Sequence, residues 1–102
     1  MLAGFSVLPV GVGGEFRKHI AAVVDVIDKS GLKYKLGTMQ TIIEGDQEEV
    51  MQVIMQCHKL MMEQAGRVIT SITIDDRKGA VDRLEGKVAD VEAELGRPVH
   101  RE

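Results

Sequence analysis

Apolar and polar residues alternate in a way that predicts four β-strands. In the segment VITSITID, the apolar or β-branched residues Val68, Thr70, Ile72 and Ile74 alternate with a more polar set, which is the two-residue period of a strand. An apolar run near the N-terminus ends at proline and glycines, and two short β-forming segments flank the sequence GTMQ, whose length suits a hairpin turn. The predicted strands are Leu2–Pro9, Lys33–Leu36, Thr41–Glu44 and Val68–Asp75.

Apolar residues at helical spacing predict three helices. The first should end at the Ser-Gly pair at 30–31, because glycine readily adopts the left-handed conformation of a helix end. The second should begin at Asp46, which with Glu49 resembles a capping box, and end near 65–66. The third is rich in charge and should end at Gly96. The apolar stripes are Phe16, Ile20, Val23, Val24 and Ile27; Val50, Val53, Ile54, Cys57 and Met61; and Leu84, Val88, Val91 and Leu95.

The predicted order is βαββαβ followed by a further helix, which is the split-βαβ arrangement. It implies an α+β sandwich in which two helices cover one face of a four-stranded antiparallel sheet. The length of 102 residues is close to the commonest size of a single domain. We therefore expect one domain over residues 1–96, including the C-terminal helix, and a polar tail at 97–102.

The second face of this sheet has a mixed character. If the more apolar sets of the first and last strands face the helices, the open face carries hydroxyl groups beside two large apolar side chains. Such a half-polar face suits a subunit interface with a small-molecule pocket in it. A second stripe on the second helix, Met51, Met55 and Met62 with His58, fills the core or meets another subunit, and the pattern favours neither. The expected open-face residues are Ser6, Leu8, Ile69, Ser71 and Thr73.

Composition and charge narrow the range of partners. Thirteen basic residues against sixteen acidic ones give a formal net charge of -3, and only three residues are aromatic, so we expect no nucleic-acid partner. Cys57 is the only cysteine and cannot form a disulfide within the chain, which fits a reducing compartment. No signal peptide and no apolar run of about 20 residues is evident. We therefore expect a cytoplasmic protein without a membrane partner.

Groups that carry catalytic or metal chemistry are scattered along the chain. The three histidines, His19, His58 and His100, do not stand at a zinc-type spacing from one another or from a cysteine. Cys57 lies on the predicted buried stripe, where packing is its expected role, and the adjacent His58 points elsewhere on the helix. We therefore predict neither an enzyme nor a metal site.

Two further segments have a structural and a functional interpretation. PVGVGG, at residues 9–14, is either a flexible connection or an anion contact at a helix start, and it lacks the full signature of a P-loop or a dinucleotide-binding loop. DDRK, at 75–78, is either a solvated turn with local ion pairs or a pair of carboxylates that orients a cationic ligand.

The order and spacing of several short motifs resemble the small thiamine-binding protein family of about a hundred residues. The motifs are IEGD at 43–46 after a YxLGxMxT stretch, IDDR at 74–77, LEGKV at 84–88, and SVLPVGVG in and after the first strand. The resemblance extends from Phe5 to about Leu95. It implies a ferredoxin-like fold, assembly into homodimers and homotetramers through sheet surfaces and the C-terminal helix, and binding of thiamine or its hydroxymethylpyrimidine portion without catalysis or a cofactor.

The chemistry of such a ligand selects a set of residues around the hairpin. An aminopyrimidine requires acceptors and donors, which Glu44, Thr41, Thr38 and Ser6 offer, and a flat thiazolium cation favours an aromatic ring and negative charge. Alternation along a strand puts Thr41 and Glu44 on opposite faces, so a regular strand cannot direct both into one pocket. Glu44 has the alternative role of binding backbone N–H groups at the helix start that follows it. The predicted ligand-binding residues are Ser6, Tyr34, Thr38, Met39, Thr41, Glu44 and Asp75.

Two functional hypotheses follow. The first is a non-enzymatic oligomer that binds thiamine or a related pyrimidine at the open sheet face and the 37–41 turn. The alternative is a structural or regulatory interaction protein whose open face only mediates oligomerisation, and it predicts no pocket near Ser6 and Thr41.

Overall fold

The computed structural model describes residues 1–13 and 17–100 of the chain. Residues 14–16, which belong to the predicted glycine loop and the first apolar stripe, and the last two residues of the predicted tail lie outside this description. The strands have the predicted bounds. The elements are β1 (Leu2–Pro9), α1 (Arg17–Lys29), β2 (Lys33–Leu36), β3 (Thr41–Glu44), α2 (Gln47–Ala65), β4 (Val68–Asp75) and α3 (Arg83–Leu95).

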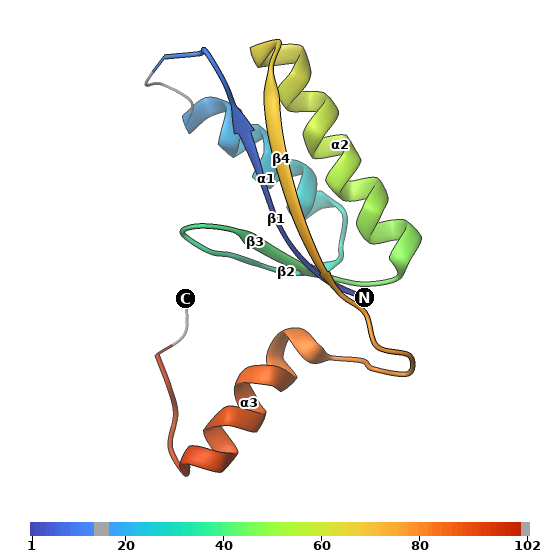
Figure 1. Ribbon diagram of the computed structural model, residues 1–102, viewed down its shortest axis with the longest axis vertical. Helices are drawn as coiled ribbons and strands as arrows, with labels where there is room; N and C mark the ends of the chain where they lie inside the picture. Colours follow the sequence, from blue (N-terminus) through green and yellow to red (C-terminus); the bar gives the residue numbers. More distant parts are fainter. Residues whose placement is uncertain (14–16, 101–102) are drawn as a thin grey trace.

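The strands form one antiparallel sheet in the order β2-β3-β1-β4. Helices α1 and α2 lie side by side on one face of this sheet (Figure 1). The prediction of an α+β, ferredoxin-like sandwich with an additional C-terminal helix is therefore confirmed.

Local sequence signals explain the limits of α2, the longest helix. Its N-cap is Asp46, whose carboxylate accepts a hydrogen bond from the Glu48 N–H at 3.2 Å. Its C-cap is Gly66, which has a φ of 74° in the left-handed region that glycine adopts without a steric penalty. The apolar stripe between these caps packs against the sheet and α1. The buried residues of α2 are Val50, Val53, Ile54, Cys57 and Met61.

The register of the sheet assigns its two faces. Directly opposite residues of an antiparallel pair point to the same face, so the buried Phe5 marks the helix-covered face together with Thr41 and Ile72, its partners in β3 and β4. Ser6 opposes Ser71 on the open face. Leu8 likewise opposes Ile69, so the predicted half-polar composition of the open face is confirmed.

Two hydrogen bonds beyond the strand ends show which backbone groups point to which neighbour. The Val10 N–H donates to the Arg67 carbonyl at 2.9 Å, which continues the β1–β4 register by one step. The Gly45 N–H donates to the Met1 carbonyl at 3.1 Å and continues the β1–β3 register. Hydrogen-bonded and non-hydrogen-bonded pairs alternate in an antiparallel ladder. Even-numbered residues of β1 therefore direct their backbone groups to β4, and odd-numbered residues direct theirs to β3.

Helix α3 lies apart from the α1–α2 layer, beyond the sheet end at which β4 leaves (Figure 1). Leu84, in its first turn, is buried, whereas Val91 and Leu95 further along its apolar stripe are about half exposed. Across residues 1–13 and 17–100, the helices lack the combination of length and apolar character that crossing a bilayer requires.

Candidate functional site

The short hairpin leaves part of β1 without a neighbour, and a cavity occupies this position. Strand β3 pairs with β1 only as far as the Phe5–Thr41 pair. The chain then turns through 37–40, where the Gly37 N–H donates to the Gln40 carbonyl at 2.9 Å, and the hairpin diverges from β1 (Figure 1). A cavity of about 150 Å³ lies between the β1 edge, this turn and α1. Its lining residues are Phe5, Ser6, Val7, Ile20, Val23, Val24, Leu36, Gly37, Thr38, Met39, Gln40, Thr41 and Met61.

The backbone of Val7 is the unpaired strand segment in this cavity. Val7 is odd-numbered, so its N–H and C=O point to the side on which β3 has ended. Within the described residues neither group has a backbone or side-chain partner. A half-buried residue with an unused donor and acceptor is unusual, because most such backbone groups are paired. This edge can therefore accept a ligand that presents one acceptor and one donor side by side.

The walls of this cavity combine an apolar floor with uncharged polar groups. Phe5, Val23 and Met61 belong to the buried core and form apolar lining. Gly4 lets the Gln40 side chain lie against β1, because a Cβ on this glycine would stand 2.8 Å from Gln40 Oε1. None of the lining residues that the structure describes carries a charge. Such a site favours a flat, polar, neutral ring over an ion.

The structure brings four of the seven predicted ligand-binding residues to this cavity. They are Ser6, Thr38, Met39 and Thr41. In the isolated chain a pocket therefore exists near Ser6 and Thr41, which the assembly-only hypothesis does not predict. The cavity opens at a strand edge between the turn and α1, and the open sheet face contributes Ser6 to it.

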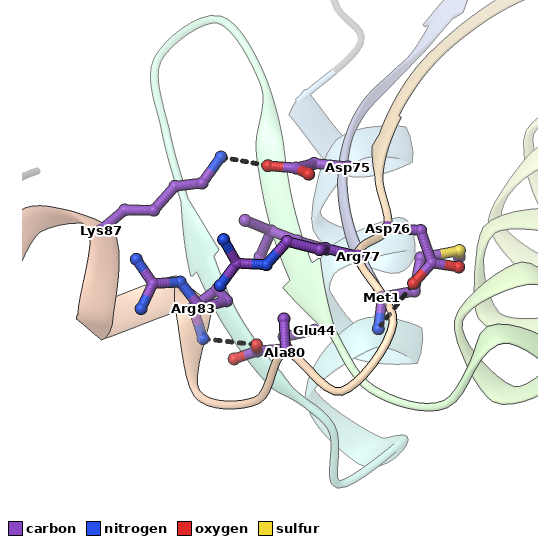
Figure 2. A pocket seen from close by; sticks show the side chains of 9 residues that line it. Met1, Glu44, Asp75, Asp76, Arg77, Ala80, Arg83 and Lys87 are labelled. Carbon is purple, nitrogen blue, oxygen red and sulfur yellow. Dashed lines mark hydrogen bonds and ion pairs between the residues drawn. The ribbon is translucent and has the colours of Figure 1, made fainter.

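Glu44 and Asp75 line a different cavity, of about 110 Å³, between the end of the sheet and α3 (Figure 2). Glu44 Oε2 accepts the Arg83 N–H at 2.6 Å and Oε1 accepts the Leu84 N–H at 3.2 Å. Glu44 therefore binds backbone N–H groups at a helix start, but the helix is α3, some forty residues later, and not the adjacent α2. Thr41 and Glu44 lie on opposite faces, as alternation predicts.

The need for a distant carboxylate at α3 has a local cause. Asp82 precedes the helix in a left-handed conformation, with φ of 54°, and its side chain makes no capping hydrogen bond. Its carboxylate instead pairs with Lys33 of β2. Glu44 thus accepts the first N–H groups of α3, which the side chain of Asp82 does not cap.

Charged residues make up much of the lining of this second cavity. Asp75 pairs with Lys87, and this hydrogen bond and the lysine charge hold the pKa of Asp75 below its ordinary value. Asp76 lies 3.9 Å from the Met1 amino group. Figure 2 shows these carboxylates directed toward cationic groups at the cavity rim. Asp75 is the last residue of β4, and the ion pairs of Asp75 and Asp76 join the DDRK segment to Lys87 and Met1, so they are not the local pairs that the turn interpretation predicts.

Tyr34 lines neither of these two cavities. It pairs with Ile43 in the sheet, and its hydroxyl donates a hydrogen bond to Asp28 Oδ1 at 2.9 Å. This hydrogen bond, burial and the negative charge of Asp28 together raise the pKa of Tyr34. In this chain the aromatic ring therefore ties β2 to α1.

The remaining reactive groups pack or link helices. Cys57 is buried with its thiol directed at the Val23 carbonyl, and burial raises its pKa to about 11. Its predicted packing role is confirmed. His58 Nδ1 lies 2.7 Å from Thr70 Oγ1 and joins α2 to β4. Among the described side chains, no group of three or more His, Cys, Asp or Glu residues is placed to hold a metal ion.

Residue-level reasoning missed several residues of the first cavity, and two of them contribute polar groups to it. The Val7 backbone carries no side-chain signal, and Gln40 was treated only as part of the turn. The available clue was length: β1 has eight residues and β3 has four, so a paired β3 must leave part of β1 uncovered.

Related proteins share both sequence and fold with this chain. A UPF0045 protein of Mycobacterium bovis is 38% identical over 99 residues, which cover 96% of this chain and 97% of that protein. A UPF0045 protein of Methanocaldococcus jannaschii is 30% identical over 88 residues, or 86% and 88% of the two chains.

Solved structures agree with this relation. A hypothetical protein of Methanocaldococcus jannaschii superposes with a TM-score of 0.81 at 29% identity and covers 88% of this chain and 93% of its own. A Thermotoga maritima protein described as a candidate for thiamine biosynthesis or salvage gives a TM-score of 0.78 at 26% identity, with 88% and 96% coverage. The family model of the thiamine-binding protein matches residues 3–92. The chain therefore belongs to the thiamine-binding protein family.

Proposed function

We propose that this protein binds thiamine, or its hydroxymethylpyrimidine portion, without catalysing a reaction, and that the pyrimidine ring lies in the cavity beside Val7. The observation that carries the proposal is the unpaired N–H and C=O of Val7 in an uncharged, partly apolar cavity. An aminopyrimidine presents an amine donor next to a ring-nitrogen acceptor. A strand edge offers the complementary acceptor and donor, as it does when it binds a peptide strand.

The size of the cavity agrees with one ring. A cavity of about 150 Å³ in another protein holds a benzene molecule, whereas sites for whole drug-sized ligands measure about 300–1,000 Å³. The cavity here, of about 150 Å³, therefore encloses a pyrimidine and leaves a thiazolium outside. Both proposed ligands share the enclosed ring, so both should bind.

The side chains around the ring complete the proposed contacts. The hydroxyls of Ser6, Thr38 and Thr41 can each donate or accept a hydrogen bond. Met39 stands at the tip of the turn with 85% of its surface exposed, so its thioether can close over a bound aromatic ring. Tyr34, Glu44 and Asp75 would contact this ligand only from a second subunit. The proposal therefore includes a self-associating homodimer or homotetramer, in the cytoplasm.

The family supplies the second line of support. The matching family model carries the description thiamine-binding protein, and the Thermotoga maritima relative is linked by its description to thiamine biosynthesis or salvage.

Calorimetric titration of the purified protein with thiamine, hydroxymethylpyrimidine and hydroxyethylthiazole tests the proposal. We expect comparable heats from the first two ligands, none from the thiazole, and a rise in unfolding temperature with the binders, because a ligand specific for the folded state stabilises it. Thr41→Val should weaken binding, whereas Thr73→Val, a matched change on β4 outside the cavity, should not. No heat and no thermal shift at millimolar thiamine and pyrimidine would refute the proposal.

A further inference from the structure

Met39, at the tip of the β2–β3 turn, is the most exposed methionine of the chain. All six methionines lie in the described residues. Met39 is 85% exposed, against 43% for Met55 and 40% for Met62 on α2. The other three lie in or against the hydrophobic core and are Met1, Met51 and Met61. A small oxidant dissolved in water therefore reaches Met39 more readily than any other thioether of this chain.

The packing of the core does not account for this position. The turn is closed by the Gly37 N–H, which donates to the Gln40 carbonyl at 2.9 Å, and Met39 lies between these two residues. Within the residues that the structure describes, Met39 is not one of the apolar side chains that pack against the core. It belongs instead to the lining of the cavity beside Val7. A change in the polarity of Met39 should therefore alter the mouth of the cavity and leave the fold intact.

A second methionine of this cavity provides a contrast. Met61 also lines it, but its exposed fraction is 0%, and it belongs to the same core cluster as Phe5 and Val23. Two thioethers thus line one cavity, one open to solvent and one closed off from it. An oxidant in solution should distinguish between them.

We propose that Met39 is a site of reversible oxidation by hydroperoxides, and that its sulfoxide lowers the affinity of the cavity for an aromatic ring. The first half depends only on the exposure of the side chain. The second half rests on the proposed function, in which Met39 closes over the bound pyrimidine. The protein would then hold its ligand under reducing conditions and release part of it when peroxide accumulates.

The oxidation is a transfer of one oxygen atom. A sulfur lone pair of Met39 attacks one oxygen of hydrogen peroxide, the O–O bond breaks, and an S=O bond forms. The proton of the transferred oxygen passes to the departing hydroxide, which leaves as water, so sulfur loses two electrons and the peroxide gains them. A thiol-dependent methionine sulfoxide reductase reverses the change, since two thiols become a disulfide and the oxygen leaves as water.

The sulfoxide should disfavour the closed position of this side chain. A thioether is apolar and polarisable and makes favourable contacts with aromatic rings, whereas a sulfoxide is polar and keeps its oxygen in water. The lining of the cavity near the turn includes the apolar Leu36 and Val24, which offer that oxygen no hydrogen bond. Loss of one sulfur–ring contact should weaken ligand binding about two- to tenfold.

The order of oxidation tests the first half. The whole protein is treated with limiting hydrogen peroxide, and sulfoxides are located by mass spectrometry of its peptides. Met39 should be oxidised first, Met55 and Met62 more slowly, and Met61 last. In urea, where the chain is unfolded, the four rates should become similar. Oxidation of Met55 or Met62 as early as Met39 in the folded protein would overturn the assignment of the site.

A comparison of two leucine variants tests the second half. Met39→Leu and Met62→Leu each remove one thioether, and Met62 lies on α2 outside the cavity. Calorimetry with hydroxymethylpyrimidine, before and after peroxide, should show a two- to tenfold loss of affinity in the native protein and in Met62→Leu. Met39→Leu should keep whatever affinity it has before treatment. Methionine sulfoxide reductase with dithiothreitol should restore the native protein.

Protection by the ligand gives a further readout. Saturating hydroxymethylpyrimidine should slow the oxidation of Met39 and leave that of Met62 unchanged, because only Met39 lies at the cavity. Equal rates at Met39 with and without bound ligand, or an affinity that oxidation of Met39 does not change, would overturn the second half.

Failure of this inference differs from failure of the proposed function. If the reduced protein binds neither thiamine nor the pyrimidine, the proposed function and the second half fail together, and the order of oxidation still decides whether Met39 is the oxidised site. If the reduced protein binds and the oxidised protein binds equally well, the proposed function stands and the second half is wrong.

Discussion

The sheet leaves strand backbone unpaired in two regions that differ in length and surroundings. At Val7 of β1, one residue offers an N–H and a C=O inside a cavity, and Pro9, the next residue pointing the same way, has no N–H. On β4, the Arg67 carbonyl accepts the Val10 N–H, so even-numbered residues face away from β1, and four successive outward residues offer both groups along an exposed edge. The same chemical groups are therefore recessed in one region and exposed in the other.

This difference shows how unpaired strand backbone can serve two different kinds of partner in one small sheet. A recess with one donor and one acceptor matches a single heterocycle and excludes a polypeptide strand. A long exposed edge matches a strand and gives a small molecule little to enclose it. The length and depth of the unpaired segment, more than its chemistry, decide the partner.

The largest expected effect is a loss of self-association when proline replaces an outward-facing residue of β4. Ile72→Pro removes an outward N–H, so in a homodimer that pairs through this edge of β4 two carbonyls would lose their donors, at about 1–3 kcal/mol each. Self-association should weaken about thirtyfold or more, as measured by sedimentation, while ligand binding is retained. Ile72→Ala is the matched control, because it truncates the same side chain and keeps the N–H.

The same substitution one residue later should act on the fold. Thr73 faces β1, so Thr73→Pro removes a ladder hydrogen bond and should lower the free energy of unfolding by about 1–3 kcal/mol. If Thr73→Pro were the milder of the two in thermal unfolding, the assignment of inward and outward residues would be wrong.

Val7→Pro addresses the other unpaired region. The Val7 N–H donates no hydrogen bond in either ladder, so its removal should leave the sheet paired but weaken pyrimidine binding by about 1–3 kcal/mol, or about five- to 150-fold. Calorimetry measures this loss. Val7→Ala shares the loss of packing but keeps the N–H. Equal ligand affinities of the two variants would show that the Val7 N–H does not bind the ligand.

Glu44→Ala tests the contact between the end of β3 and the start of α3. Without the carboxylate the first amides of α3 lose their acceptor, and we expect a loss of about 0.5–2 kcal/mol, in the range of an N-cap deletion. Amide exchange should accelerate in the first turn of α3 and stay slow in the β1–β4 ladder. Glu44→Gln keeps one acceptor oxygen and should show a smaller change.

The smallest effect concerns acid stability. Lys87 lowers the pKa of Asp75 in the folded state, so this pair contributes stability above the ordinary carboxyl pKa of about 3.9 and loses it as the pH falls through the lowered value. Asp75→Asn should therefore flatten the dependence of unfolding temperature on pH below about pH 4. Asp75 is exposed, so the change should be slight, and an unchanged curve would show that solvent screens the pair completely.

Sequence patterns predicted the features that depend on neighbouring residues. Alternation in VITSITID placed Ser71 on the open face, and Asp46 and Gly66 marked the ends of α2. The same alternation showed that Thr41 and Glu44 could not share a pocket. Each of these signals depends on residues a few positions apart, and the structure confirms the predictions made from them.

Features that depend on distant segments were not visible in these patterns. Glu44 was predicted to bind N–H groups at the start of the helix that follows it, and the helix was wrong: its partners are in α3, and nothing in its own segment indicates this, because the contact follows from where the chain returns after β4. The unpaired groups of Val7 depend on how far a separate hairpin extends along β1. Asp75 was grouped with the hairpin by ligand chemistry, whereas Lys87 engages it at the α3 junction.

The length of the β2–β3 hairpin determines how much of β1 stays unpaired and therefore the size of the ligand that fits. If each arm were two residues longer, β3 would reach Val7, the backbone groups of Val7 would join the ladder, and the unpaired edge in the cavity would be lost. A shorter hairpin would uncover more of β1 and admit a larger ring system. Relatives with the same fold could thus differ in what they bind through insertions and deletions in this one turn, and the same change offers a simple route to redesigning the site.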